Sequence, residues 1–224
     1  MNSVVVSVGG SVVLSDDASV DFLKKLASVL KKVGKQYRLF VIIGGGTIAR
    51  RYIQLGRELG FDEDTLDLIG IDITRVNARI ITNLLGVSNK EIPHTTDEAI
   101  GLDFPIVVMG GTDPKHSTDT VGAEVAEKTH AIRFVNATNV DGIYDKDPKK
   151  YSDAKKLAEV TIDQLIAQYG TTWGAAGKNI FMDEPALAII KRAKIPTFVV
   201  NGKRLDQLEK AMTGKPFDGT TILV

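Results

Sequence analysis

The sequence contains no cysteine, and this absence excludes several kinds of chemistry at once. Without a thiol among its 224 residues, the chain has no disulfide, no thiolate nucleophile and no cysteine-bound metal or iron–sulfur centre. The only three histidines, His94, His116 and His130, are scattered and lack the short spacing of a shared metal site. We therefore expect no metal ion held directly by protein side chains.

Long apolar runs and an excess of charge of one sign are also missing. Polar and charged residues interrupt every apolar stretch well before the roughly 18 residues of a membrane-spanning helix. Lys plus Arg equals Asp plus Glu at 28 each, so no broad field attracts nucleic acid or an anionic membrane. The first residues have no basic segment typical of a signal peptide. We expect a cytoplasmic protein that binds neither nucleic acid nor membrane.

Apolar runs alternate with helix-period segments along the whole chain. The runs predict strands at residues 4–8, 39–43, 106–109, 132–135, 196–200 and 221–224, the last of them as an edge strand. The periodic segments predict helices at 22–33, 47–59, 62–85, 119–128, 183–192 (with Asp183 as its N-cap) and 205–212. Such alternation is typical of a mainly parallel sheet covered on both faces. The predicted fold is an α/β class, three-layer α/β/α sandwich in a single domain.

Two predicted strands run directly into glycine turns, Gly9-Gly10-Ser11 and Gly44-Gly45-Gly46. Glycine lets a backbone approach a ligand closely, and the free N–H groups at the start of the following helix favour an anion. Either turn alone is as well explained as an ordinary tight turn. Two facing turns favour two phosphoryl groups held against each other. Neither turn fits the P-loop pattern, and no G-x-G-x-x-G follows a strand.

Four strand ends carry polar or glycine-rich sequences: the two turns above, Gly110-Gly111, and the Asn-Ala-Thr-Asn segment at 136–139. Ligands of parallel sheets gather at the carboxyl ends of strands, so all four are predicted to line one edge. Arg50, one helical turn past Gly46, is predicted to project toward the same mouth.

The segment 134–148 is the most specific in the chain. It combines amide, carboxylate, aromatic and lysine side chains just past a buried strand, a mixture that suits a nucleotide, although an ordinary surface loop is the alternative. Tyr144 is a candidate to pack on a base. Asp141 is a candidate to orient cationic groups or water around Mg²⁺, which proteins usually hold through few carboxylates, waters and substrate phosphates.

Together, Gly9-Gly10-Ser11, Gly44-Gly45-Gly46 and the segment 138–144 resemble the amino acid kinase family over essentially the whole chain. Within that family, residues 67–78 resemble the acceptor-side helix of uridylate kinases, and residues 110–119 resemble their uridine-recognition loop. The short chain is most similar to the archaeal type. The resemblance implies a kinase of pyrimidine nucleotide biosynthesis that transfers the γ-phosphoryl group of ATP to UMP.

The resemblance also implies ligand contacts. The implied ATP-binding residues are Ser7, Val8, Gly9, Gly10, Ser11, Gly46, Arg50, Thr138, Asn139, Tyr144 and Asp147. The implied UMP-binding residues are Gly45, Asp67, Thr112, Asp113, Pro114, Lys115, His116, Ser117 and Thr118. Acceptor binding then falls in about 1–130 and ATP binding in about 131–224. Mg²⁺ would enter with ATP, held mainly by phosphates and water, and the assembly would be a homohexamer.

For catalysis we assign Gly10, Arg50, Asp141 and a lysine. Many family members carry a lysine two residues before the first Gly-Gly, where this chain has Ser7. Lys178, in a glycine-rich stretch, is our candidate to replace it, with Lys146 second; a surface position is the simpler explanation of each.

Two alternatives stay open. In the first alternative the chain is a kinase with the same fold and the same donor, and its acceptor is isopentenyl phosphate, carbamate or acetylglutamate. Otherwise the chain is a non-catalytic nucleotide-binding storage or sensor protein, an alternative that rests on the loss of the lysine at Ser7.

Overall fold

The computed structural model describes residues 1–14, 19–146, 148, 150–169 and 182–224. In this part of the chain the strands are β1 (Ser3–Val8), β2 (Arg38–Ile43), β3 (Ile106–Met109), β4 (Arg133–Thr138), β5 (Glu159–Thr161), β6 (Thr197–Asn201) and β7 (Gly219–Leu223). The helices are α1 (Gly10–Val13), α2 (Val20–Gly34), α3 (Gly46–Glu58), α4 (Glu63–Leu85), α5 (Thr96–Gly101), α6 (Thr118–Lys128), α7 (Ile162–Tyr169), α8 (Glu184–Ala193) and α9 (Leu205–Thr213).

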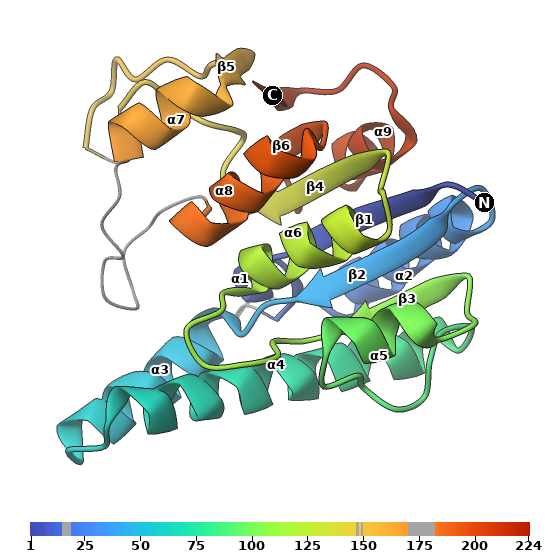
Figure 1. The fold of residues 1–224 in the computed structure, drawn as a ribbon, viewed down its shortest axis with the longest axis vertical. Coiled ribbons are helices and arrows are strands. Elements are labelled where there is room, and N and C mark those ends of the chain that lie inside the picture. Colours follow the sequence, from blue (N-terminus) through green and yellow to red (C-terminus); the bar gives the residue numbers. More distant parts are fainter. Residues whose placement is uncertain (15–18, 147, 149, 170–181) are drawn as a thin grey trace.

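The described strands form one seven-stranded sheet in the order β3-β2-β1-β4-β6-β7-β5. All neighbours pair in parallel except β6 and β7, which are antiparallel. The predicted mainly parallel sheet is therefore confirmed (Figure 1). The carboxyl ends of β3, β2, β1 and β4 consequently lie side by side, as the sequence predicted for the four glycine-rich or polar strand ends.

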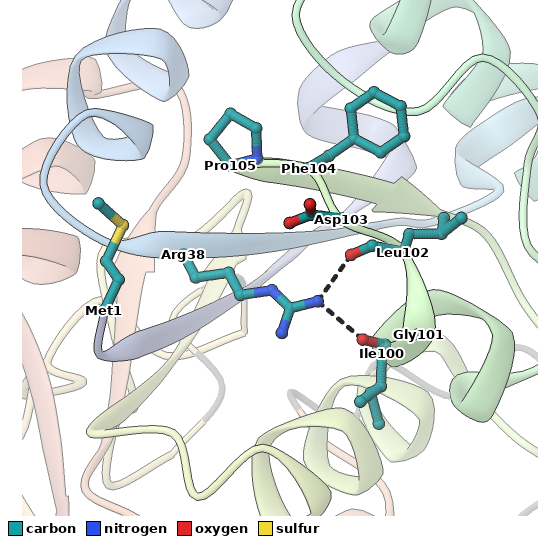
Figure 2. A pocket seen from close by; sticks show the side chains of 8 residues that line it. All are labelled: Met1, Arg38, Ile100, Gly101, Leu102, Asp103, Phe104 and Pro105. Carbon is teal, nitrogen blue, oxygen red and sulfur yellow. Dashed lines mark hydrogen bonds between the residues drawn. The ribbon is translucent and has the colours of Figure 1, made fainter.

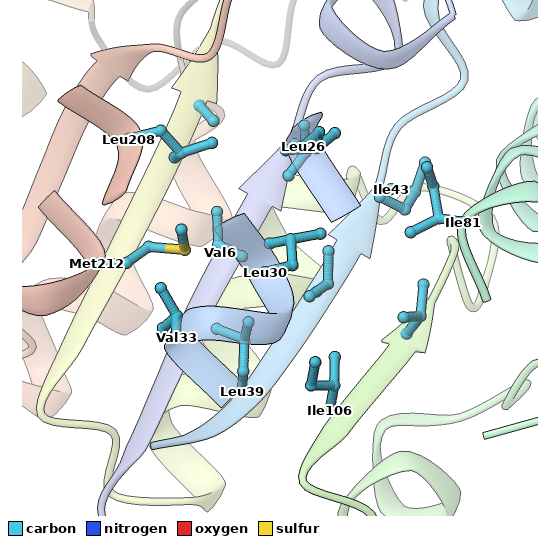
Figure 3. Close-up of a cluster of buried hydrophobic side chains, with 14 of the residues drawn as sticks. Val6, Leu26, Leu30, Val33, Leu39, Ile43, Ile81, Ile106, Leu208 and Met212 are labelled. Atoms are coloured by element: carbon cyan, nitrogen blue, oxygen red, sulfur yellow. The ribbon is translucent and has the colours of Figure 1, made fainter. Parts of the chain in front are cut away.

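Helices cover both faces of the sheet because successive side chains of a strand point to opposite sides. Val4, Val6 and Val8 of β1 join a core cluster with apolar residues of α2, α4 and α9, whereas Val5 joins a second cluster with residues of α5, α6 and α8. Figure 3 shows the first cluster. Since both faces are buried, the strands read as continuous apolar runs, and the α/β/α sandwich is confirmed.

The C-terminal strand was placed wrongly at the edge. β7 lies between β6 and β5, and β5 forms that edge of the sheet. β5 could not be predicted because it is a strand of three residues, too short for a periodic pattern. The short helices α1 and α5 and the helix α7 were also missed; α1 and α5 have four and six residues.

An open pocket lies at the opposite edge, between the start of β2 and the segment that leads into β3 (Figure 2). Arg38 reaches across it, and its Nη2 donates to the carbonyl oxygens of Ile100 and Leu102, both at 2.7 Å. The guanidinium thus ties the end of α5 to β2. Among the described residues, no helix has the length and apolar composition needed to cross a membrane.

Candidate active site

The two glycine turns meet backbone to backbone. A Cβ added to Gly10 would lie 2.2 Å from the nitrogen of Gly46 and 2.5 Å from the oxygen of Gly44. Gly46 also has a φ of +68°, which side chains other than glycine rarely adopt. Only glycines fit this contact, so the predicted facing turns are present in the structure.

The second glycine turn, Gly44-Gly45-Gly46, opens α3, which begins at Gly46. Its N-cap, Gly45, offers no side-chain cap, so the first N–H groups of this 13-residue helix are left for another partner. Those groups and the positive end of the helix dipole favour an anion. Arg50 follows one turn later and is exposed.

Ser7, where the resemblance led us to expect a lysine, is bonded to an acid. Its Oγ donates to Oδ1 of Asp119 at 2.7 Å. Burial raises the pKa of the Asp119 carboxyl to about 7; the nearby charge of Asp183 adds to this rise, and hydrogen bonds from Ser7 and Asn136 oppose it. We did not assign a function to Asp119 from the sequence, although it is the last residue of the 110–119 motif. The one signal was its place in the first turn of the helix after that loop.

A second carboxylate lies close to Asp119. Oδ2 of Asp183 accepts a hydrogen bond from Oγ1 of Thr120 at 2.7 Å. Asp183 occupies the N-cap position of α8 as predicted, but its side chain makes no capping bond. Its Oδ1 is buried and has no partner among the described residues. The carboxyl ends of β1 and β4 are therefore lined with acid where a lysine was expected.

The structure brings Asp67 and the 112–118 loop together. Oδ2 of Asp67, on α4, accepts a hydrogen bond from the backbone N–H of Lys115 at 2.8 Å. Lys115 has a φ of +68°, and its Nζ pairs with Asp64 at 3.3 Å. Asp67 is thus not merely a solvated helix position. One carboxylate oxygen holds the loop, which leaves Oδ1 for a ligand.

Other residues of this loop also contact protein groups. Oγ of Ser117 caps α6 by accepting from the N–H groups of Asp119 and Thr120, at 3.2 and 3.1 Å. His116 lies on the exposed side, with Nδ1 3.7 Å from Oε1 of Glu124. Thr112 is buried, whereas Asp113 is exposed. The loop therefore offers mainly backbone groups and short side chains to a ligand.

The predicted ATP side lies at the carboxyl ends of β4 and β6. The N–H of Gly202 donates to the oxygen of Thr138 at 2.8 Å, and Nδ2 of Asn201 donates to Oδ1 of Asp141 at 2.9 Å. Asn139 is exposed beside them. Sequence reasoning missed Asn201, whose partner lies 60 residues away. Asp141 is thus tied to the end of β6.

Lys146, the second lysine candidate, is paired with an acid of its own segment. Nζ of Lys146 pairs with Asp153 at 2.6 Å and lies 5.5 Å above the ring of Tyr151. This partner neutralises its charge. The other candidate, Lys178, and the predicted ATP contact Asp147 lie outside the described residues.

Carboxylates, which suit Mg²⁺, lie near the carboxyl ends of β1 and β6. Asp119 and Asp183 lie near each other at the end of β1, and Asp141 lies beyond β4. In the described ranges, no three His, Asp or Glu side chains come close enough to hold a metal together. The donors fit an ion that is carried mainly by phosphates and water and touched by one or two carboxylates.

Comparison with known proteins agrees with this geometry. Residues 2–201 match the family model described as the amino acid kinase family. A uridylate kinase of Methanobrevibacter smithii is 40% identical over 223 residues, covering 98% of each chain. One from Thermoplasma volcanium is 41% identical over 222 residues, covering 98% of this chain and 97% of its own.

Solved structures agree as well. The crystal structure of uridylate kinase from Archaeoglobus fulgidus has a TM-score of 0.87 and 38% identity, and the match covers 99% of this chain and 100% of that one. UMP kinase from Ureaplasma parvum, at 23% identity and a TM-score of 0.81, shares the fold. This chain therefore belongs to the amino acid kinase family.

Proposed function

We propose that this chain is a UMP kinase, which transfers the γ-phosphoryl group of ATP to UMP and releases ADP and UDP. The observation that carries the proposal is the backbone contact between Gly10 and Gly46 at the carboxyl edge of the sheet. Two phosphate-binding turns in contact hold donor and acceptor phosphates in line. The choice of acceptor is supported by relatives named uridylate kinase over nearly the whole chain.

The acceptor lies on the side of α3 and α4. Gly45 faces the UMP phosphate, Asp67 accepts from the ribose hydroxyls through Oδ1, and the 112–118 loop reads the base. A site built from hydrogen-bonding groups rejects an acceptor that lacks the matching polar groups. ATP lies over the first glycine turn and the 138–144 segment. Apart from its contacts with ATP at the glycine turns, the part of the chain at about 1–130 binds the acceptor, and the part at about 131–224 binds ATP.

The rate of phosphoryl transfer comes mainly from positioning the two substrates and neutralising the charge on the transferring group. The amides of Gly10 and Gly46 and the guanidinium of Arg50 stabilise the transferring group. The phosphate of UMP is already ionised at neutral pH, so the acceptor needs no general base. Lys178 remains our proposed lysine for the charge that Ser7 does not provide.

We also propose that the divalent ion that enters with ATP is Mg²⁺. When bound, it neutralises negative charge on the transferring phosphates. Asp119, bonded to Ser7 of β1, and Asp141, bonded to Asn201 of β6, would touch it or its waters. Ser7 holds Asp119 in place for this contact, through the hydrogen bond of 2.7 Å.

An acceptor panel tests the function. ADP release is measured with Mg²⁺, ATP and, separately, UMP, CMP, isopentenyl phosphate, carbamate, aspartate and acetylglutamate. We expect turnover with UMP and formation of UDP. Turnover with another acceptor and none with UMP would refute the proposal. Tight binding of ATP and UMP without UDP would favour the non-catalytic storage or sensor protein.

A homo-oligomer, for which we propose a homohexamer, is supported by apolar side chains on the outside of α3 and α4. Ile48, Tyr52 and Leu55 of α3 and its C-cap residue Leu59 are exposed at spacings of four, three and four residues, which put them on one helix face. A stripe of this kind on a monomer marks an interaction surface.

A further inference from the structure

Buried side chains of α4 hold the backbone of both acceptor-side loops. Nδ2 of Asn77 donates to the carbonyl oxygen of Gly44 at 2.9 Å and to that of Gly45 at 3.3 Å. Asn77 is 2% exposed and lies mid-helix, where asparagine has low helix propensity. A polar side chain in this place is explained by its bonds to the glycine turn.

These two bonds fix the direction of two amides. In a planar trans peptide the C=O and the following N–H point in opposite directions. Because Asn77 draws the oxygens of Gly44 and Gly45 toward α4, the N–H groups of Gly45 and Gly46 point away from α4. The backbone nitrogen of Gly46 accordingly lies on the side of Gly10, where a Cβ would meet it at 2.2 Å.

The same helix turn holds the other acceptor loop. Oγ1 of Thr74 accepts from the N–H of Gly111 at 2.7 Å, and Arg75 donates to the oxygens of Gly111 and Thr112 at 3.3 and 3.1 Å. One stretch of α4, residues 74–77, therefore sets the distance between the end of β2 and the end of β3.

We propose that Asn77 is a positioning residue, which aims the amide of Gly45 at the phosphate of the acceptor and the amide of Gly46 at the transferring group. The inference rests on the proposed function for the identity of that acceptor. Asn77 touches no reacting atom, and it acts through the glycine turn. A loss of its bonds lets the turn rotate, and misplacement of about 1 Å costs about 10²-fold in rate.

The test separates positioning from mere helix packing. Asn77→Ala removes both bonds, and Asn77→Asp keeps the shape while it removes the donor. The matched control is Thr82→Val, a buried position of the same helix whose Oγ1 donates only to the oxygen of Arg79 within α4. For each variant, UMP and uridine affinities are measured by calorimetry, together with kcat and KM for UMP and ATP and the thermal unfolding midpoint.

We expect both Asn77 variants to lose most of the preference for UMP over uridine, because the phosphate contact is lost and the uridine contact stays. We expect kcat/KM for UMP to fall by about 10- to 100-fold and KM for ATP to stay near the wild-type value. Thr82→Val should keep the wild-type affinity ratio even where its unfolding midpoint falls.

Two results would overturn the inference. If Asn77→Ala keeps the wild-type ratio of UMP affinity to uridine affinity, the inference is refuted and the proposed function is unaffected. Equal losses in Thr82→Val show that helix stability alone is measured. If the wild-type protein makes no UDP in the acceptor panel, the proposed function falls first and the inference with it.

Discussion

Ser7 and Asp119 put a hydroxyl and a carboxylate at the end of β1, in the place of an expected lysine charge. Burial of Asp119 and the neighbouring Asp183 raise the pKa of the Asp119 carboxyl to about 7. At neutral pH the end of β1 therefore carries less negative charge than its acids suggest, and it would repel a phosphate less. A bound cation would favour the ionised form of Asp119, so Mg²⁺ bound there would release a proton.

Stability should depend on pH through Asp119. The pKa of the carboxyl is 3.8 in the unfolded chain and about 7 in the folded one. Between these values the folded state binds a proton that the unfolded state has lost, so the free energy of unfolding falls as pH rises from 4 to 7, by at most about 1.4 kcal/mol per pH unit. Asp119→Asn should lack this contribution.

Urea denaturation at pH 4, 5, 6, 7 and 8 checks the expected slope. The free energy of unfolding of Asp119→Asn, relative to wild type, should increase over this range and level off above pH 7. Parallel curves for the two proteins would contradict the raised pKa. The variant should also need more Mg²⁺ for half-maximal UDP formation.

Residues whose chemistry is local could be predicted, and those with distant partners could not. The glycine turns could be predicted because the strand, the glycines and the helix follow each other directly in the sequence. Ser7 and Asp119 are 112 positions apart, and Asn77 is 33 positions from Gly44. No local pattern marks such pairs. Asp67 was predicted as a ligand contact from its motif, but its bond to the N–H of Lys115 could be seen only in the fold.

At the scale of elements, length decided what the sequence revealed. The 23-residue α4 and 13-residue α3 span several helical turns, so their apolar period is plain. The four-residue α1 and three-residue β5 are too short to show one. β7 was misplaced because a sequence shows that a strand exists but not which neighbours it takes. β7 pairs antiparallel with β6 and parallel with β5, and this choice of neighbours is a tertiary property.

The contact between the ends of β1 and β2 should not tolerate a side chain at Gly10. In Gly10→Ala, the Cβ would meet backbone atoms of Gly44 and Gly46 at 2.5 and 2.2 Å. Backbone cannot move aside cheaply, so we expect a loss of about 1–3 kcal/mol of stability and of at least about 10²-fold in kcat/KM. Thermal unfolding and UDP formation measure the two effects.

Gly101→Ala serves as the control, because Gly101 ends α5 and a Cβ there meets nothing within 4 Å. This variant should match wild type in both measurements. A Gly10→Ala enzyme with wild-type rates would show that the two turns need not touch during catalysis.

At the scale of the whole molecule, α3 and α4 lie side by side and extend beyond the sheet (Figure 1). Their outer surface carries the α3 stripe of Ile48, Tyr52, Leu55 and Leu59, together with Leu68, Val76 and Ile80 of α4. The exposed fraction of Leu59 reaches 64%. Burying apolar area is the main driving force of association, so this surface should be covered by another copy of the chain.

Charge placed on the α3 stripe should therefore break the assembly. The double variant Leu55→Glu/Leu59→Glu puts two carboxylates where apolar contact is expected, and burying an unpaired carboxylate is costly. We expect a smaller sedimentation coefficient than wild type at equal concentration, with the far-ultraviolet spectrum of a folded chain.

Val20→Glu, at an exposed apolar residue of α2, should sediment as wild type does. A monomeric wild-type protein, or a double variant that keeps the wild-type mass, would show that the stripe is not the contact. Because α3 begins at Gly46, dissociation should also weaken UMP binding, and a calorimetric titration of the same variant measures that link between assembly and site.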